Sequence, residues 1–311
     1  MNNPLTMRRS VPEDAEPGIW TAADGWAVRT LRLRPPGHRR GSLLFAGGRG
    51  DFAEKYIESL VHWRTQGWDV TAFDWRGQGA SGRASGLPPE LGHADDFVPW
   101  LDDVAGLMTE WQARSAGPHV LVGHSMGGHL MLRLVAERRP QIAALVLSSA
   151  MIGFHAPLPE RILRAVAAAQ VRRGRSSRFA WGQGRRPDAM NMLRQRRLTR
   201  DAARYADELW WLEQRPDYRL GGVSWGWLDA ACRSTDELEQ PGVAEGIGMP
   251  VLLVATRNDR VVDAPRAVAL VSRIPDHEIT LIDGGHELLR ERDDIRLAAW
   301  QRIDRFLDER V

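Results

Sequence analysis

One serine stands between two glycines in the stretch GHSMG at residues 123–127, directly after the apolar run HVLV. A serine at the tip of a sharp turn from a strand into a helix has a strained backbone. Side chains two residues before and after it would collide with the neighbouring strand and helix, and Gly123 and Gly127 avoid those collisions. The pattern therefore predicts a nucleophile elbow with Ser125 as the nucleophile.

A serine hydroxyl is a poor nucleophile unless a base takes its proton. In α/β sheets with this turn, the acid and the base follow the serine in the order Asp or Glu, then His. The chain has nine histidines, and His286 follows the apolar run EITLID at the end of an expected strand, where ligands gather in open α/β sheets. His277 precedes that run. We therefore predict His286 as the general base.

The carboxylate that orients the histidine should leave the preceding strand, and three aspartates compete for this role. Asp259 lies in the turn directly after the run VLLVAT. Asp263 stands where the next helix begins and is expected to cap it, and Asp283 is expected to serve its own turn. Position in the fold therefore favours Asp259 as the third member of a Ser-His-Asp triad.

An oxyanion formed beside Ser125 needs backbone N–H donors. The turn aims the N–H of Met126, at the positive end of the following helix, at that space. The second donor normally comes from the loop after an early strand, and the glycine-rich stretch FAGGRGD offers the N–H of Arg49. The Arg49 side chain is a separate matter, because it could bind either a substrate phosphate or a nearby acid.

Matches of five residues occur by chance, so the elements around Ser125 decide what the pattern means. Short apolar runs alternate with helix-length segments on both sides of it. Expected strands lie in residues 26–35, 41–51, 68–82, 118–123, 142–150, 249–259 and 278–286, and expected helices in residues 54–67, 94–112, 128–140, 263–275 and 298–311. This alternation predicts an α/β fold with a mostly parallel sheet covered by helices on both faces.

Residues 151–240 interrupt the alternation, because they are rich in tryptophan and arginine and hold no comparable strand. We predict that they form a mainly helical cap inserted into a core domain made of residues 1–150 and 241–311. Residues 1–18, with three prolines among charges, are expected to be a loose arm. The cap tryptophans could line an acyl-chain channel or pack the interior of the cap: Trp181, Trp210, Trp211, Trp225 and Trp227.

With these residues in place, the sequence resembles the α/β-hydrolase superfamily, in the branch of the serine aminopeptidase S33 type that holds bacterial lysophospholipases and monoacylglycerol lipases. Four blocks carry the resemblance in the family's order: AGGRGDFAEKY, FDWRGQGASGR, VGHSMGGHL, and ATRNDRVV followed later by DGGHELLRE. It covers about residues 25–150 and 245–310. The resemblance implies an α/β-hydrolase fold and the same triad and oxyanion donors as above.

One departure from the family pattern concerns the oxyanion loop. Many relatives have His-Gly before the oxyanion residue, whereas this chain has Gly47 and Gly48. The backbone donor is kept, but the departure weakens an assignment to the monoacylglycerol lipases proper. The block FDWRGQGASG is expected to be structural and is given no chemistry.

The composition is that of a globular protein with a sizeable core, since 43% of the 311 residues are hydrophobic and 26% are charged. The formal net charge of +2 gives no case for nucleic-acid binding. Lys55 is the only lysine among the 42 basic residues, a bias that a GC-rich coding sequence would produce. Cys232 is the only cysteine, which excludes an internal disulfide and a cysteine-based metal site.

The first residues are polar and lack the apolar core of a signal peptide, and no uncharged apolar stretch approaches the ~20 residues that span a bilayer. The expected localisation is cytoplasmic. Residues 160–200 carry twelve arginines against Glu160 and Asp188. This excess could attract anionic lipid headgroups in a peripheral membrane contact, or it could be an ordinary solvated face. The oligomeric state is not predicted.

The sequence thus predicts a serine carboxylic ester hydrolase that needs neither a metal nor an organic cofactor. By resemblance alone, the preferred substrate is a lysophospholipid or a monoacylglycerol. A peptidase is one alternative, and it would need an acidic anchor in the cap for the substrate's amino group, with these candidates: Asp201, Asp207, Glu208, Glu213 and Asp217. A non-catalytic binding protein on a hydrolase scaffold is another, although an intact Ser, Asp and His argues against it.

Overall fold

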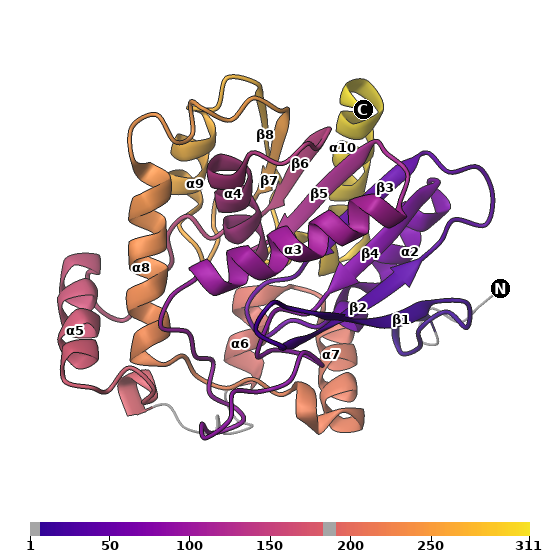
Figure 1. Cartoon of the computed structure of the whole chain (residues 1–311). Helices are drawn as coiled ribbons and strands as arrows, with labels where there is room; N and C mark the ends of the chain where they lie inside the picture. The colour runs from indigo at the N-terminus through magenta and orange to yellow at the C-terminus, as the bar shows by residue number, and fades with distance from the viewer. Residues whose placement is uncertain (1–6, 183–190) are drawn as a thin grey trace.

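A single eight-stranded sheet runs through the protein, in the strand order β1-β2-β4-β3-β5-β6-β7-β8 (Figure 1). The computed structural model describes residues 7–182 and 191–311. The strands are β1 (Glu16–Thr21), β2 (Ala27–Leu33), β3 (Gly41–Ala46), β4 (Trp68–Phe73), β5 (His119–His124), β6 (Ala144–Ser148), β7 (Val251–Ala255) and β8 (His277–Leu281). Strands β1 and β2 pair antiparallel, as do β2 and β4, and the other neighbours pair parallel.

Both faces of the sheet are covered because its central strands are apolar on both sides. Along β5, Leu121 belongs to one hydrophobic core, whereas Val120 and Val122 belong to the other. The first core holds residues of α3 (Val98–Arg114), α4 (Met126–Arg138) and α9 (Ala264–Val271), and the second holds residues of α2 (Ile57–Thr65) and α10 (Asp293–Arg310). The predicted fold class is confirmed.

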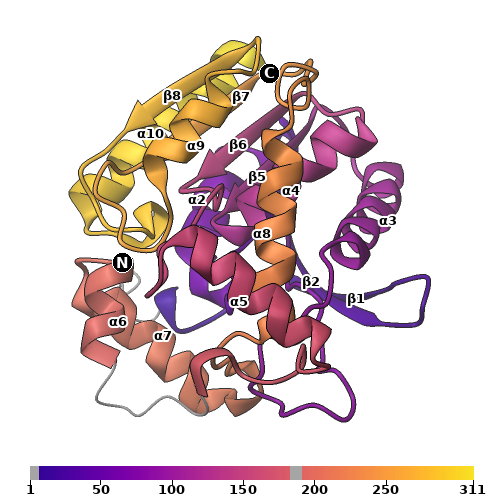
Figure 2. The same ribbon diagram turned by 90° about the vertical axis from the view of Figure 1, so that its left-hand side faces the viewer.

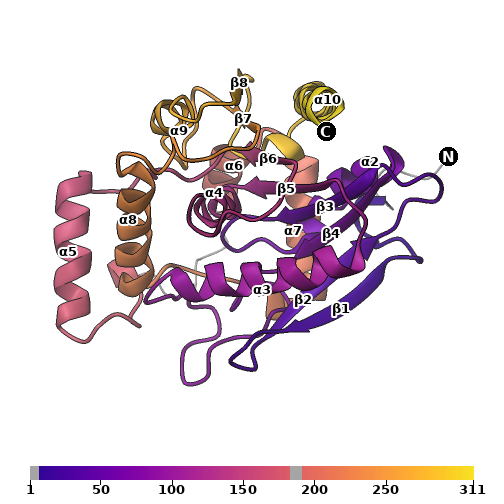
Figure 3. The ribbon, with the colours of Figure 1, turned by 45° about the horizontal axis from the view of Figure 1, so that its top comes forward.

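The chain between β6 and β7 is a helical insertion, as predicted. It contains α5 (Glu160–Arg172), α6 (Asn191–Leu198), α7 (Ala202–Gln214) and α8 (Trp225–Glu239). Helix α5 packs along α8 and is the outermost helix on that side (Figures 2 and 3). Helices α6 and α7 lie beyond the carboxyl ends of the parallel strands, below them in Figure 1. The division into a core and a cap at residues 150 and 241 stays a prediction.

The tryptophans of the insertion that are described pack against other protein groups. Trp225 and Trp227 are buried, and their rings lie 4.9 Å from that of Trp181 and 5.8 Å from that of Phe97, respectively. Trp211 donates its indole N–H to the Arg8 carbonyl at 3.0 Å. These contacts favour the interpretation in which the tryptophans pack the insertion and anchor it to the rest of the chain.

Charges elsewhere in the chain balance part of the arginine excess in residues 160–200. Arg194 pairs with Glu208 at 2.6 Å, and Arg200 pairs with Asp283 at 2.7 Å. Three charged residues of that stretch lie outside the described residues: Arg185, Arg186 and Asp188.

The prediction of a loose N-terminal arm is wrong for residues 7–18, and residues 1–6 lie outside the described part. Arg8 and Arg9 both form ion pairs with Asp207 of α7, the second at 2.7 Å. Strand β1 begins at Glu16 and pairs with β2. The ion pairs with Asp207 hold this segment in place. The sequence could not reveal them, because Asp207 lies about 200 residues later in the chain.

None of the helices in residues 7–182 and 191–311 combines the length and the apolar character needed to cross a membrane. Within the same residues, no group of three or more His, Cys, Asp and Glu side chains is arranged to hold a metal ion. Cys232 is buried as a free thiol, and burial raises its pKa to about 11.

Candidate active site

Ser125 occupies the turn between β5 and α4 with φ 52° and ψ −119°, a strained conformation for a residue with a side chain. The two predicted glycines make this turn possible. A Cβ on Gly123 would lie 2.6 Å from Gly128 Cα, and a Cβ on Gly127 would lie 2.5 Å from the Ala46 carbonyl oxygen. Both obstacles are backbone atoms, so neither position can hold a side chain without moving a strand or a helix.

Replacing Gly127 with alanine is therefore expected to destabilise the fold by about 3 kcal/mol, at the upper end of what overpacking costs. Urea unfolding monitored by circular dichroism measures this difference. Gly37→Ala is the matched control, because a Cβ there meets nothing within 4 Å. Equal stability of the two variants would contradict the steric argument.

The structure brings the three residues predicted as a triad together. The Ser125 Oγ lies 3.0 Å from His286 Nε2, and His286 Nδ1 lies 2.8 Å from Asp259 Oδ2. Ser125 follows β5, Asp259 follows β7 and His286 follows β8, so all three lie beyond the carboxyl ends of parallel strands. All three are buried.

The second oxygen of Asp259 is also occupied. Asp259 Oδ1 accepts the N–H groups of Val261 at 2.8 Å and Val262 at 3.0 Å, which fixes the plane of the carboxylate. Burial alone would raise the pKa of Asp259. The charge and hydrogen bond of His286, together with the two N–H groups, outweigh burial and hold the pKa below its ordinary value. Asp259 therefore stays ionised beside His286.

Of the other two aspartates, Asp263 has the role that the sequence predicted for it, whereas the role of Asp283 in its own turn stays a prediction. Asp263 caps α9, since its Oδ1 accepts the Arg266 N–H at 3.0 Å. Asp283 follows β8 and pairs with Arg200 from the insertion. Neither of these partners is a residue of the predicted triad.

Neighbouring groups hold the loop that carries His286. Gly285 donates its N–H to Glu291 Oε1 at 2.6 Å, and Glu287 donates its N–H to the Leu198 carbonyl at 2.8 Å, at the end of α6. The ring of His124 lies 4.9 Å from that of His286. Burial, followed by the neighbouring His286, lowers the pKa of His124 to about 4, so His124 is a neutral neighbour at physiological pH.

The loop of residues 47–51 passes directly over the serine. A Cβ on Gly48 would lie 2.9 Å from Ser125 Cβ, so this position requires glycine. The Gly48 N–H donates to Asp51 Oδ2 at 2.7 Å, and the Gly50 N–H donates to Gln78 Oε1 at 2.5 Å. This loop therefore brings the backbone of residue 49 close to Ser125 in a fixed shape.

Asp51 and Gln78 were not singled out in the sequence, although both shape this loop. Gln78 belongs to the FDWRGQGASG block, which was expected to be structural. Asp74 of the same block accepts the N–H groups of Ala53 and Ala80, each at 2.9 Å. The block is thus structural in a specific sense, because it fixes the loop that approaches Ser125. The sequence could have indicated Asp51, because an aspartate three residues after Gly48 in a glycine-rich loop can accept the Gly48 N–H.

Residues 37–293 match the family described as serine aminopeptidase, S33. The chain belongs to this family. It is accordingly an α/β-hydrolase of the esterase and lipase type, and the family resemblance of the sequence is confirmed.

The curated relatives of this S33 hydrolase include two proteins of similar length. Lysophospholipase L2 of Escherichia coli is 29% identical, over 98% of this chain and 90% of the relative. The probable lysophospholipase L2 of Haemophilus influenzae is 26% identical, over 89% of this chain and 86% of the relative.

Solved structures share the fold of this S33 hydrolase at lower sequence identity. A monoglyceride lipase from Saccharomyces cerevisiae superposes with a TM-score of 0.76 at 17% identity, over 98% of both chains. A carboxyl esterase from Bacillus coagulans superposes with a TM-score of 0.72 at 16% identity, over 95% of this chain and 98% of the esterase. At these identities the likeness concerns the fold.

The Arg49 side chain of this S33 hydrolase reaches the insertion. Its Nη2 donates to the Gly221 carbonyl at 3.0 Å, and its guanidinium carbon lies 5.9 Å from the centre of the Trp227 ring. The side chain thus links the loop over Ser125 to the insertion. The two roles considered from the sequence, binding of a substrate phosphate or of a nearby acid, stay predictions.

Proposed function

We propose that this S33 hydrolase is a serine carboxylic ester hydrolase, with Ser125, His286 and Asp259 as its catalytic triad. The observation that carries the proposal is the position of His286, whose two ring nitrogens face Ser125 Oγ at 3.0 Å and Asp259 Oδ2 at 2.8 Å. An imidazole held between a hydroxyl and an ionised carboxylate can take a proton from the first while the second stabilises the resulting charge.

In the acylation half of the reaction, Ser125 Oγ attacks the ester carbonyl carbon as His286 Nε2 takes the hydroxyl proton. Asp259 accepts the hydrogen bond from Nδ1 and thereby holds the tautomer with a free Nε2. The backbone N–H groups of Arg49 and Met126 stabilise the negative oxygen of the tetrahedral intermediate. His286 then gives its proton to the leaving alcohol, the ester C–O bond breaks, and an acyl-serine remains.

In the deacylation half, His286 takes a proton from a water molecule as that water attacks the acyl carbon. The same two N–H groups stabilise the second tetrahedral intermediate. Its collapse breaks the bond to Ser125 Oγ, which regains the proton from His286, and the carboxylic acid leaves. These steps use only groups of this chain and one water molecule.

We further propose that the substrate is a lipid-like ester, either a lysophospholipid or a monoacylglycerol. The relatives named lysophospholipase L2 support the first choice, since they match nearly the whole chain. The glycines at positions 47 and 48 are a reason to rank monoacylglycerol second.

The peptidase alternative loses support because four of its five candidate anchors already hold cations of the chain. Asp207 pairs with Arg8 and Arg9, and Glu208 pairs with Lys55. The remaining two of the four do the same: Asp201 pairs with Arg204, and Asp217 pairs with Arg215. A carboxylate whose charge is already balanced by a cation of the chain attracts a substrate ammonium group less strongly than a free one would.

The test uses the wild-type protein and a fluorophosphonate probe, which reacts with activated serines. We expect the probe to label Ser125, as located by mass spectrometry, and lysophospholipids to be hydrolysed faster than monoacylglycerols and much faster than aminoacyl amides. Labelling combined with a preference for aminoacyl amides would establish the peptidase instead. Folded protein that resists labelling would indicate a non-catalytic binding protein.

A further inference from the structure

Lys55, the only lysine of the chain, is buried beside three carboxylates. It lies in a short 3-10 helix, η1 (Ala53–Tyr56), and its side chain is 1% exposed. Its Nζ lies 2.6 Å from Asp51 Oδ1, 2.7 Å from Glu287 Oε1 and 3.1 Å from Glu208 Oε2. An ammonium group has three N–H donors on one compact centre, so it can serve three converging carboxylates at once.

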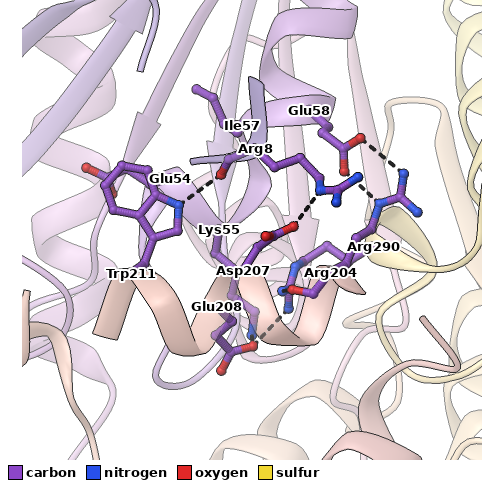
Figure 4. A pocket seen from close by; sticks show the side chains of 10 residues that line it. All are labelled: Arg8, Glu54, Lys55, Ile57, Glu58, Arg204, Asp207, Glu208, Trp211 and Arg290. Carbon is purple, nitrogen blue, oxygen red and sulfur yellow. Dashed lines mark hydrogen bonds and ion pairs between the residues drawn. The ribbon is translucent and has the colours of Figure 1, made fainter. Parts of the chain in front are cut away.

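The three carboxylates come from three segments that are far apart in the sequence. Asp51 belongs to the loop over Ser125, and its other oxygen holds the Gly48 N–H at 2.7 Å. Glu287 directly follows His286. Glu208 belongs to helix α7 of the insertion, and Figure 4 shows its side chain together with those of Lys55 and Arg290. One ammonium group thus joins both loops of the site to the insertion.

The cluster around Lys55 is balanced in charge. Arg290 Nη1 lies 2.5 Å from Glu287 Oε2 and 2.9 Å from Glu208 Oε2. Three cations therefore face three carboxylates: Lys55, Arg194 and Arg290, with Asp51, Glu208 and Glu287. A buried group in such a network is costly to remove, because its partners keep their charge without a counter-ion.

The balance keeps these groups ionised. Burial alone would lower the pKa of Lys55, but Asp51, Glu208 and Glu287 outweigh burial and raise it above the ordinary value. Burial likewise opposes ionisation of Asp51, and Lys55 followed by His124 brings the pKa of Asp51 down to about 2. The tie between Lys55 and the loop over Ser125 is thus an ion pair throughout the physiological range.

We propose that Lys55 is a positioning residue of the active site, which holds the loop over Ser125, the His286 loop and helix α7 at a fixed separation. The inference rests on the proposed function, because the distance that Lys55 sets is the one between the backbone N–H of Arg49, as an oxyanion donor, and His286, as the general base. Through Glu208, the same ammonium group couples the position of the insertion to that distance.

The test measures kcat and KM for a short p-nitrophenyl ester, which is too small to depend on a lipid pocket. Lys55→Met keeps an apolar stem of four atoms and removes the ammonium group at its end. We expect kcat to fall by up to about 100-fold, because a misplacement of about 1 Å at a catalytic group has an effect of this size. KM is expected to stay unchanged, since the interaction lost matters in the transition state.

A second variant separates an effect on the position of the catalytic groups from an effect on the stability of the fold. It replaces Lys55→Met as the test if that variant does not fold. Lys55→Met combined with Glu208→Gln leaves two cations facing two carboxylates, so the cluster is again balanced in charge. It does not restore the ion pairs of Lys55 with Asp51 and Glu287. Thermal stability is expected to recover in this double variant, whereas kcat is expected to stay low. Recovery of kcat together with stability would overturn the proposal, as would a wild-type kcat in folded Lys55→Met.

The matched control removes one partner of a partly buried ion pair near the amino end of β4. Arg32 of β2 binds both oxygens of Asp69, at 2.8 and 2.6 Å, near the start of β4. Arg32→Met is expected to lower thermal stability while kcat and KM keep their wild-type values. If wild-type protein neither hydrolyses the ester nor reacts with the fluorophosphonate, the proposed function fails, and the role of Lys55 fails with it.

Discussion

Ser125→Ala is expected to reduce the turnover of a short p-nitrophenyl ester on the order of 10⁶-fold, the size of effect known for loss of a triad serine. The reason is that the Oγ facing His286 Nε2 is the atom that would form the acyl intermediate. Without it, the oxyanion donors could still polarise a bound ester, so a small residual rate is expected. Steady-state assays with a matched enzyme concentration measure the loss.

The fold is expected to survive this change, because the variant removes one oxygen atom and leaves the turn glycines in place. Circular dichroism and thermal unfolding should therefore match those of the wild type. Ser42→Ala is a suitable control, since Ser42 is a buried serine near the start of β3 whose Oγ donates to the Ala116 carbonyl. Retained turnover in Ser125→Ala would exclude the mechanism proposed above.

The sheet could be predicted from the sequence because its central strands are apolar on both faces, a pattern that is rare outside covered parallel sheets. Element ends were less accurate. Helix α4 begins at Met126 rather than at residue 128, because the elbow leads into the helix directly after Ser125. Strand β1 was missed, since EPGIWT contains a proline and a glycine and owes its order to pairing with β2.

For the site as well, roles that depend on neighbours in the sequence could be predicted, whereas contacts between distant segments could not. Asp263 could be recognised as a helix cap from its local position, and this left Asp259 as the better candidate for the triad. The cluster around Lys55 could not be predicted, because its carboxylates at positions 51, 208 and 287 meet only in the folded chain. The sequence shows that Lys55 is a lone lysine among arginines, but a GC-rich coding sequence explains that bias without any role for Lys55.

Asp259→Asn is expected to lower kcat about 10⁴-fold, through the tautomer of His286. An asparagine can keep its oxygen on the N–H groups of Val261 and Val262, and its NH₂ group then faces His286 Nδ1. The imidazole must accept that hydrogen bond and carry its proton on Nε2, where it can no longer accept the proton of Ser125. The loss follows although no atom is displaced.

Asp263→Asn is the matched control, because asparagine caps a helix about as well as aspartate. It lies four residues from Asp259 in the same connection, and its carboxylate caps α9. We expect wild-type kcat and a nearly unchanged stability. If both variants lost activity equally, the role given to Asp259 would be wrong, and the loss would reflect general damage to this connection.

The lowered pKa of Asp259 adds a second, independent expectation. A carboxyl group with a folded pKa below its unfolded pKa stabilises the fold above the unfolded value, and this contribution is lost as the pH falls through the folded pKa. Wild-type protein should thus lose stability relative to Asp259→Asn when the pH is lowered from 6 to below the ordinary aspartate value of 3.8. A constant difference between the two stabilities across this range would mean that Asp259 is not ionised beside His286, and the tautomer argument would then fail as well.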